Sequence, residues 1–150
     1  MDPQDEINAT LEKVVLRAFE LVRKHGFHIP MGIAMSASQQ WFWVVADSSE
    51  RPDDAELDLT ACAESIRLQL RRMAKTQPLC TAAIATNLIS KFHGQETEKT
   101  TIKVSLDHAT EKGLTIYYPY SLADGKITQE TPIESQAEES FFDCKDQESK

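Results

Sequence analysis

The sequence predicts an α+β domain in which two helices lie on one face of a single, mostly antiparallel sheet of five or six strands. Two long segments, residues 3–25 and 59–75, repeat apolar side chains at intervals of three and four, as amphipathic helices do. The other apolar runs are joined by connections too short for parallel crossovers, which favours antiparallel neighbours. The expected element order is α-β-β-α-β-β-β, with a possible sixth strand.

The first helix has residues at both ends that favour helix termini. Asp2 can cap its N-terminus, Pro3 suits the first helical position, and Gly26 is placed to end it. Its apolar stripe consists of Ile7, Leu11, Val14, Val15, Ala18 and Val22. We therefore expect this helix to bury one stripe against the sheet.

A β-hairpin is expected over residues 29–46. Its first arm, residues 30–35, alternates large and small side chains, and its second arm, residues 41–46, is apolar throughout and contains Trp41 and Trp43. A strand that is apolar on both sides is typically covered on both sides. The tip lacks a strong turn dipeptide, which leaves the register open by a residue or two.

The second helix follows a polar, acidic loop, residues 47–58. Acidic residues lie before or at the start of this helix and basic residues lie at its end, an order that complements the helix dipole. Pro78 closes the helix, and the small and branched residues 79–89 indicate a strand.

The later strands show clear alternation. One side of the strand at 101–107 is apolar, and the other is a row of Thr101, Lys103, Ser105 and Asp107. A second alternating strand spans 114–120, and Asp124-Gly125 predicts a hairpin turn into a weak strand at 126–133. With both helices expected on one face, the polar row predicts an open, mostly polar opposite face.

The element order resembles that of the roadblock and profilin-like domains, which combine an antiparallel sheet with helices. A roadblock domain ends in a further helix, where this chain has an acidic tail. Segments 21–34, 81–86, 104–108 and 117–120 also resemble a group of small bacterial proteins of unknown function, in which a Pro-x-Gly strand follows a helix that ends in His-Gly. This second resemblance covers roughly residues 10–142 and implies a fold but no activity.

The length of the chain indicates the number of domains, and its net charge limits the kinds of binding partner. The chain of 150 residues fits a single domain, expected over residues 1–142, with residues 143–150 as an acidic, disordered tail. An acidic run spans residues 134–150, and Phe141 and Phe142 are its only apolar anchor. A net charge of −8 opposes binding to nucleic acid or to anionic membranes, because both bind clustered Lys and Arg.

A cytoplasmic location is expected. The three cysteines, Cys62, Cys80 and Cys144, are an odd and widely spaced set, which argues against a disulfide framework. The N-terminus is acidic where a signal peptide would be basic, and no apolar run approaches the ~20 residues of a membrane span.

No catalytic, metal or cofactor motif stands out. His25-x-x-His28 has a chelating spacing, but Gly26 interrupts the helix between the two histidines. His108 and Asp107 could be combined with Cys80 or Ser105 as a nucleophile and its base. However, Asp107 and His108 are adjacent on a strand, so their side chains point to opposite faces and cannot pair with each other. The loop acids lack the spacing of a calcium loop, and there is no glycine-rich phosphate loop. We expect no cofactor and no enzymatic activity.

The expected function is therefore that of a non-catalytic protein-binding or regulatory module. The alternative is an immunity-type protein that neutralises a toxin partner, for which small size and negative charge are suitable. The candidate interface for a protein partner or a homodimer is Trp41 and Trp43 beside Tyr117 on the open face. The tryptophans are expected to face outward with Lys103, because the alternate row, which begins at Phe42, packs more easily beneath a helix.

Overall fold

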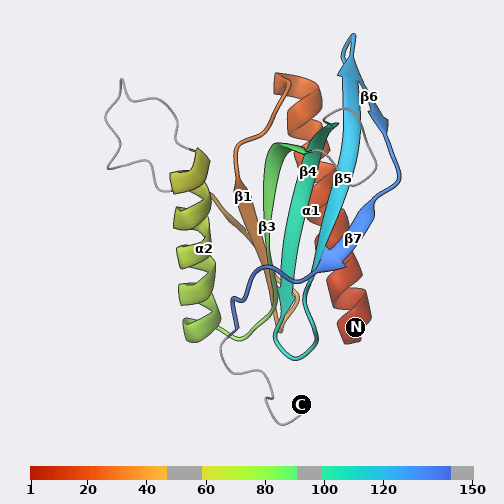
Figure 1. Cartoon of the computed structure of the whole chain (residues 1–150). Coiled ribbons are helices and arrows are strands. Elements are labelled where there is room, and N and C mark those ends of the chain that lie inside the picture. The colour runs from red at the N-terminus through yellow and green to blue at the C-terminus, as the bar shows by residue number, and fades with distance from the viewer. Residues whose placement is uncertain (47–58, 91–98, 143–150) are drawn as a thin grey trace.

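The computed structural model describes residues 1–46, 59–90 and 99–142 (Figure 1). The polar loop at 47–58 and the tail at 143–150 thus lie outside the described residues. The elements are α1 (Pro3–His25), β1 (Met31–Ser36), β2 (Trp41–Val44), α2 (Leu59–Thr76), β3 (Leu79–Ser90), β4 (Lys99–His108), β5 (Leu114–Ala123), β6 (Lys126–Gln129) and β7 (Ile133–Gln136). The prediction of an α+β fold with an antiparallel sheet is confirmed.

The sheet has seven strands, with the order β2-β1-β3-β4-β5-β6, and β7 also pairs with β5. The expected weak strand at 126–133 is divided, because β6 pairs with the end of β5 and β7 pairs with its beginning. Pro132 lies between the two and cannot donate to a ladder, which accounts for the interruption. The sheet therefore exceeds the five or six strands expected, and β7 uses residues that the sequence assigned to the acidic run.

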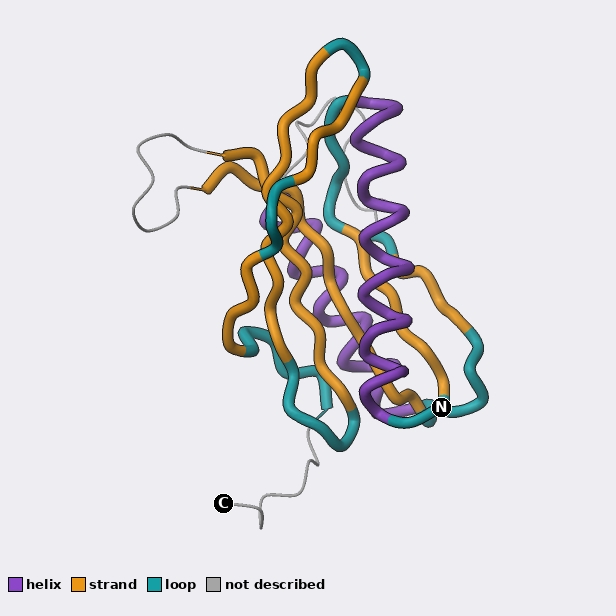
Figure 2. The backbone as a smooth tube through the Cα atoms, turned by 90° about the vertical axis from the view of Figure 1, so that its right-hand side faces the viewer, coloured by secondary structure: helices purple, strands orange, loops and turns teal. Residues whose placement is uncertain are grey.

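The two helices lie on opposite faces of the sheet, so the prediction that both lie on one face is wrong. α1 buries Val14, Ala18 and Val22 in one apolar cluster, whereas α2 buries Ile66 and Leu70 in another. Figures 1 and 2 show the sheet between the two helices. The domain thus has three layers, with one helix on each side.

The central strands explain this arrangement. Along β1, Ile33 belongs to the cluster of α1, and Ala34 belongs to the cluster of α2. The neighbouring β3 repeats the pattern with Ala83 and Ala82. Since successive strand residues point to opposite faces, small apolar residues on both sides allow a helix to approach from either side.

The polar row of β4 is covered by the chain segment that follows β7, residues 137–142 (Figure 1). Phe141 is buried in the cluster of α2, and its backbone N–H donates to Asp107 Oδ2 at 2.8 Å. The N–H of Phe142 donates to the same oxygen at 3.2 Å. Ser105 and Asp107 are buried in consequence. The predicted open polar face is therefore wrong, because a carboxylate can be buried where it accepts backbone hydrogen bonds.

Candidate functional site

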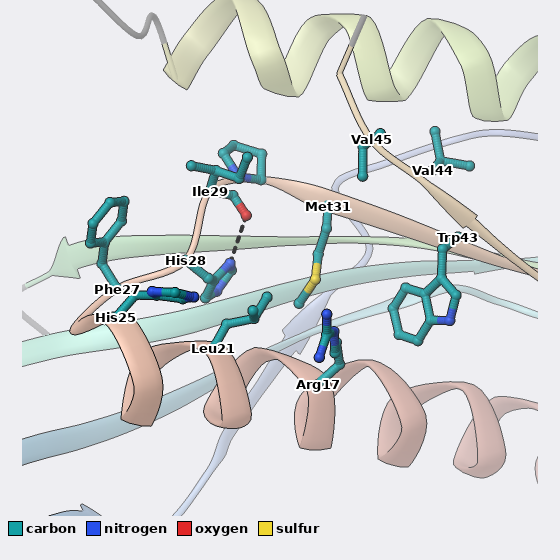
Figure 3. Close-up of a pocket in the computed structure, with 11 residues that line it drawn as sticks. Arg17, Leu21, His25, Phe27, His28, Ile29, Met31, Trp43, Val44 and Val45 are labelled. Atoms are coloured by element: carbon teal, nitrogen blue, oxygen red, sulfur yellow. Dashed lines mark hydrogen bonds between the residues drawn. The ribbon is translucent and has the colours of Figure 1, made fainter. Parts of the chain in front are cut away.

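An apolar cavity of about 650 Å³ lies beside the C-terminal half of α1, next to the start of β1 and the end of β2 (Figure 3). We refer to this cavity and its rim as the groove. Its lining residues come from three stretches: Arg17, Leu21, His25, Phe27, His28, Ile29, Pro30, Met31, Trp43, Val44 and Val45. The volume is within the range of about 300–1,000 Å³ that is typical of ligand sites.

One row of α1 forms the helical wall of the groove. Arg17, Leu21 and His25 are spaced by four residues and lie on one side of the helix. One turn earlier, the Nζ atom of Lys13 lies 5.3 Å from the ring centroid of Trp41 in a cation–π contact. This row therefore faces the two tryptophans of β2, next to the apolar stripe that the sequence analysis identified.

The opposite wall is exposed because α1 packs chiefly over β3 and β4. β2 is the edge strand on the other side of β1, so its α1-side face extends beyond the cover of the helix. As a result, the side chain of Trp43 is 45% exposed, and that of the following Val45 is 62% exposed.

The connection from α1 to β1 completes the rim. Gly26 ends the helix with a φ of 85°, a left-handed conformation that favours glycine, and its N–H donates to the carbonyl of Val22 at 2.7 Å. This turn leads the chain across the end of the groove. Phe27 and Ile29 remain 53% and 38% exposed there.

His28 has an unusual environment for a polar residue. Its side chain is only 3% exposed, and its backbone N–H donates to Asn87 Oδ1 on β3 at 3.2 Å. Nδ1 lies 2.8 Å from the carbonyl oxygen of Ile29. Because a carbonyl only accepts, Nδ1 is the protonated nitrogen and Nε2 bears the lone pair of a neutral ring. Among the described residues, Nε2 has no hydrogen-bond partner.

The electrostatics of the groove differ from those of the whole chain. The described lining residues include Arg17, His25 and His28 but no acid, although the protein has a net charge of −8. Arg17 forms a surface ion pair with Glu20 one turn further along α1. Burial lowers the pKa of His28 below its usual value, so this imidazole is neutral at neutral pH.

The groove has the composition of a binding site. Its described lining contains no Ser, Thr, Cys, Asp or Glu that could act as a nucleophile or as a carboxylate base. It does contain a large apolar surface and one buried hydrogen-bond acceptor, a combination typical of sites that recognise shape and a single polar group.

The structure brings together two of the three predicted interface residues. Trp43 lies in the groove, and Trp41 packs half-buried against the cluster of α1. Tyr117 pairs with Lys103 on the opposite face, where its hydroxyl donates to Glu138 at 3.0 Å. Burial and the nearby Glu138 raise the pKa of this hydroxyl. The prediction that all three residues share one face is wrong, because the two tryptophans lie on the α1 side of the sheet and Tyr117 lies on the α2 side.

The row that begins at Phe42 lies beneath a helix, as predicted, since Phe42 and Val44 pack in the cluster of α2. The prediction that the tryptophans share a face with Lys103 is wrong, however. They point to the side of α1, whereas Lys103 points to the side of α2 because its strand neighbour Val104 belongs to the cluster of α1.

A second polar cluster joins residues from distant parts of the chain. Nε2 of His108 donates to Glu6 on α1 at 2.8 Å, and its Nδ1 accepts the N–H of Thr110 at 3.0 Å. Cys80 lies close by, and burial together with Glu6 raises the pKa of its thiol to about 11. The thiol therefore stays protonated near neutral pH, which makes it a poor nucleophile. Asp107 points away from His108, as predicted, toward the backbone of Phe141.

Comparisons with protein-family models, with curated proteins and with solved structures find no match. The resemblances to roadblock and profilin-like domains and to small bacterial proteins therefore remain predictions. Within the described ranges, no three His, Cys, Asp or Glu side chains are grouped so that they could hold a metal ion. None of the described helices is long and apolar enough to cross a membrane.

Sequence reasoning missed the groove as a unit. Phe27 lies in the connection after the first helix, and Ile29 and Val45 lie near the two ends of the predicted hairpin, so no sequence pattern marks the three as one surface. His25 and His28 were considered as a metal pair, and both line the groove instead. The available signal was a cluster of large apolar residues immediately after a helix-ending glycine, next to a strand with two tryptophans.

Proposed function

We propose that the chain is a non-catalytic protein-binding module and that its partner docks in the groove. The supporting observation is that four large apolar side chains, Phe27, Ile29, Trp43 and Val45, are exposed around one cavity. Clustered apolar exposure is rare on monomeric proteins and marks interaction sites. Tryptophan is also among the residues that contribute most to binding energy at interfaces.

A separate partner fits this surface better than a second copy of the chain. In a symmetric dimer the same patch meets itself, and two concave patches leave their cavities unfilled. A partner segment that projects apolar side chains can fill the cavity and also cover the rim. The absence of acids from the described lining means that acidic residues beside such a segment would not be repelled locally.

The proposal includes a cytoplasmic location. Cys62 and Cys80 are free thiols, separated by the length of α2 and its turn. Unpaired cysteines of this kind are typical of reducing compartments.

Site-specific photo-crosslinking in cells that naturally produce the protein tests the proposal. Phe27→p-benzoylphenylalanine places the reactive group on the rim, and Leu68→p-benzoylphenylalanine is the matched control on an exposed apolar position of α2. We expect one defined protein adduct from position 27 and none from position 68. Adducts of equal yield from both positions, no adduct from position 27, or an adduct with a second copy of the chain would each overturn the proposal.

A further inference from the structure

We infer that the partner inserts an aromatic side chain with a hydrogen-bond donor, a tryptophan or a tyrosine, and that Nε2 of His28 accepts its N–H or O–H. This inference rests on the proposed function, and it names the side chain that the groove recognises. Its starting point is the geometry of His28, which Figure 3 shows with its ring next to the carbonyl of Ile29.

The first argument is the unpaired acceptor. Nδ1 of His28 is occupied by its hydrogen bond to Ile29, so Nε2 is the acceptor of the ring, and no described residue donates to it. A buried acceptor without a donor costs free energy, and a ligand that supplies the donor recovers it. In a low-dielectric site such a bond is stronger than in water.

The second argument is the aromatic character of the walls. Trp43 offers an exposed indole for an edge-to-face or offset-stacked contact, and Arg17 offers a guanidinium for a cation–π contact. Lys13 over Trp41 shows the same kind of contact one turn away. A planar ring between these groups would meet favourable partners on two sides.

These features exclude the other common side chains. Phenylalanine and the aliphatic residues can fill an apolar cavity but leave Nε2 of His28 without a donor. Serine, threonine and lysine have a donor but leave the apolar lining in contact with water. Only tryptophan and tyrosine combine a large apolar body with a donor at the tip.

Binding must include a local rearrangement, because Nε2 is itself covered by neighbouring atoms in the free protein. Side-chain rotamer changes of this kind are common when interfaces form, and they need little backbone movement. The backbone N–H of His28 is held by Asn87, so in this proposal the movement is assigned to the exposed rim side chains, such as Phe27 and Trp43.

Two isomeric probes test the inference on the intact protein. 3-Methylindole reproduces the tryptophan side chain, whereas 1-methylindole has the same atoms but no N–H donor. Titrations are followed by the ring ¹⁵N resonances of His28 in NMR. We expect 3-methylindole to bind about tenfold more tightly, the loss expected from one unsatisfied buried acceptor, and to shift Nε2.

The variant His28→Asn is the matched protein control, since its amide can still donate to the Ile29 carbonyl but has no group at the position of Nε2. We expect it to bind both probes with equal affinity. Equal affinities in the unmodified protein would overturn the inference, as would an Nε2 resonance that is already hydrogen-bonded in the free protein. If neither probe binds, the inference falls, while crosslinking from position 27 still decides the proposed function.

Discussion

Replacing Gly32 with alanine probes the contact between β1 and α2. A Cβ atom at this position would lie 2.7 Å from Cγ2 of Ile66 and 3.3 Å from both Cδ1 of Leu70 and Cβ of Val44. Gly32 does not have a positive φ, so the backbone accepts alanine and the cost in the folded state comes from packing. Overpacking costs about 1–3 kcal/mol, and alanine offsets about 0.4–1 kcal/mol of this through the unfolded chain. We expect a net loss of about 1–2 kcal/mol.

Urea denaturation measures this loss, and Ile66→Leu supplies the rescue. Leucine has nearly the volume of isoleucine but lacks the Cγ2 methyl group that the new Cβ would meet. In the double variant the loss from Gly32→Ala should therefore be smaller than in the single variant, and the two changes should be non-additive. An undiminished stability of Gly32→Ala, or strict additivity with Ile66→Leu, would refute the packing of α2 on this face of β1.

Three further outcomes follow from the described contacts. Phe141→Ala should lower the free energy of unfolding by about 3–5 kcal/mol, because the ring is fully buried against α2, and urea denaturation that finds less than about 1 kcal/mol would show that the segment does not dock. Cys80 should resist alkylation at about pH 8, since its thiol pKa is about 11, and mass spectrometry that finds it modified as fast as in urea would disprove its burial. Burial lowers the pKa of His28, so the unfolded chain binds its proton more readily and the free energy of unfolding falls as the pH drops below the ordinary value of 6.5. His28→Asn should reduce that slope, and an unchanged slope would assign it to other groups.

Local chemistry predicted the ends of the elements well. The side chain of Asp2 accepts the N–H of Asp5 at 2.8 Å, and Gly26 ends α1 in the left-handed conformation. Asp124 and Gly125 both have positive φ at the turn between β5 and β6, as the dipeptide predicts. These features depend on residues that are close in sequence, so the sequence alone identifies them.

The layer arrangement depended on contacts between distant residues. The alternation in β4 predicts a solvent-facing polar row, and nothing near Asp107 in the sequence indicates that the backbone of Phe141 donates to it. The apolar residues on both sides of β3 were the better guide, since a strand buried on both faces needs a cover on each. That burial on both faces favours one helix on each face.

The groove was partly predictable. Trp43 was selected from the sequence as an exposed interface residue, and the structure places it on the rim of the cavity. The partners of Trp43 were not predictable, because they depend on how far α1 extends over the sheet. That position is set by packing against β3 and β4, so the apolar residues after Gly26 indicate a cluster but do not by themselves place it beside Trp43.

Binding of the crosslinked partner to rim variants tests the central claim most directly. Dissociation constants are measured by calorimetry for Phe27→Ser and Val45→Ser, with Leu16→Ser and Leu68→Ser as controls at exposed apolar positions elsewhere. Each rim variant should weaken binding about tenfold or more, equivalent to about 1.4 kcal/mol, and the controls should bind like the unmodified protein. Rim variants with unchanged affinity, or controls that weaken binding equally, would show that the partner docks elsewhere.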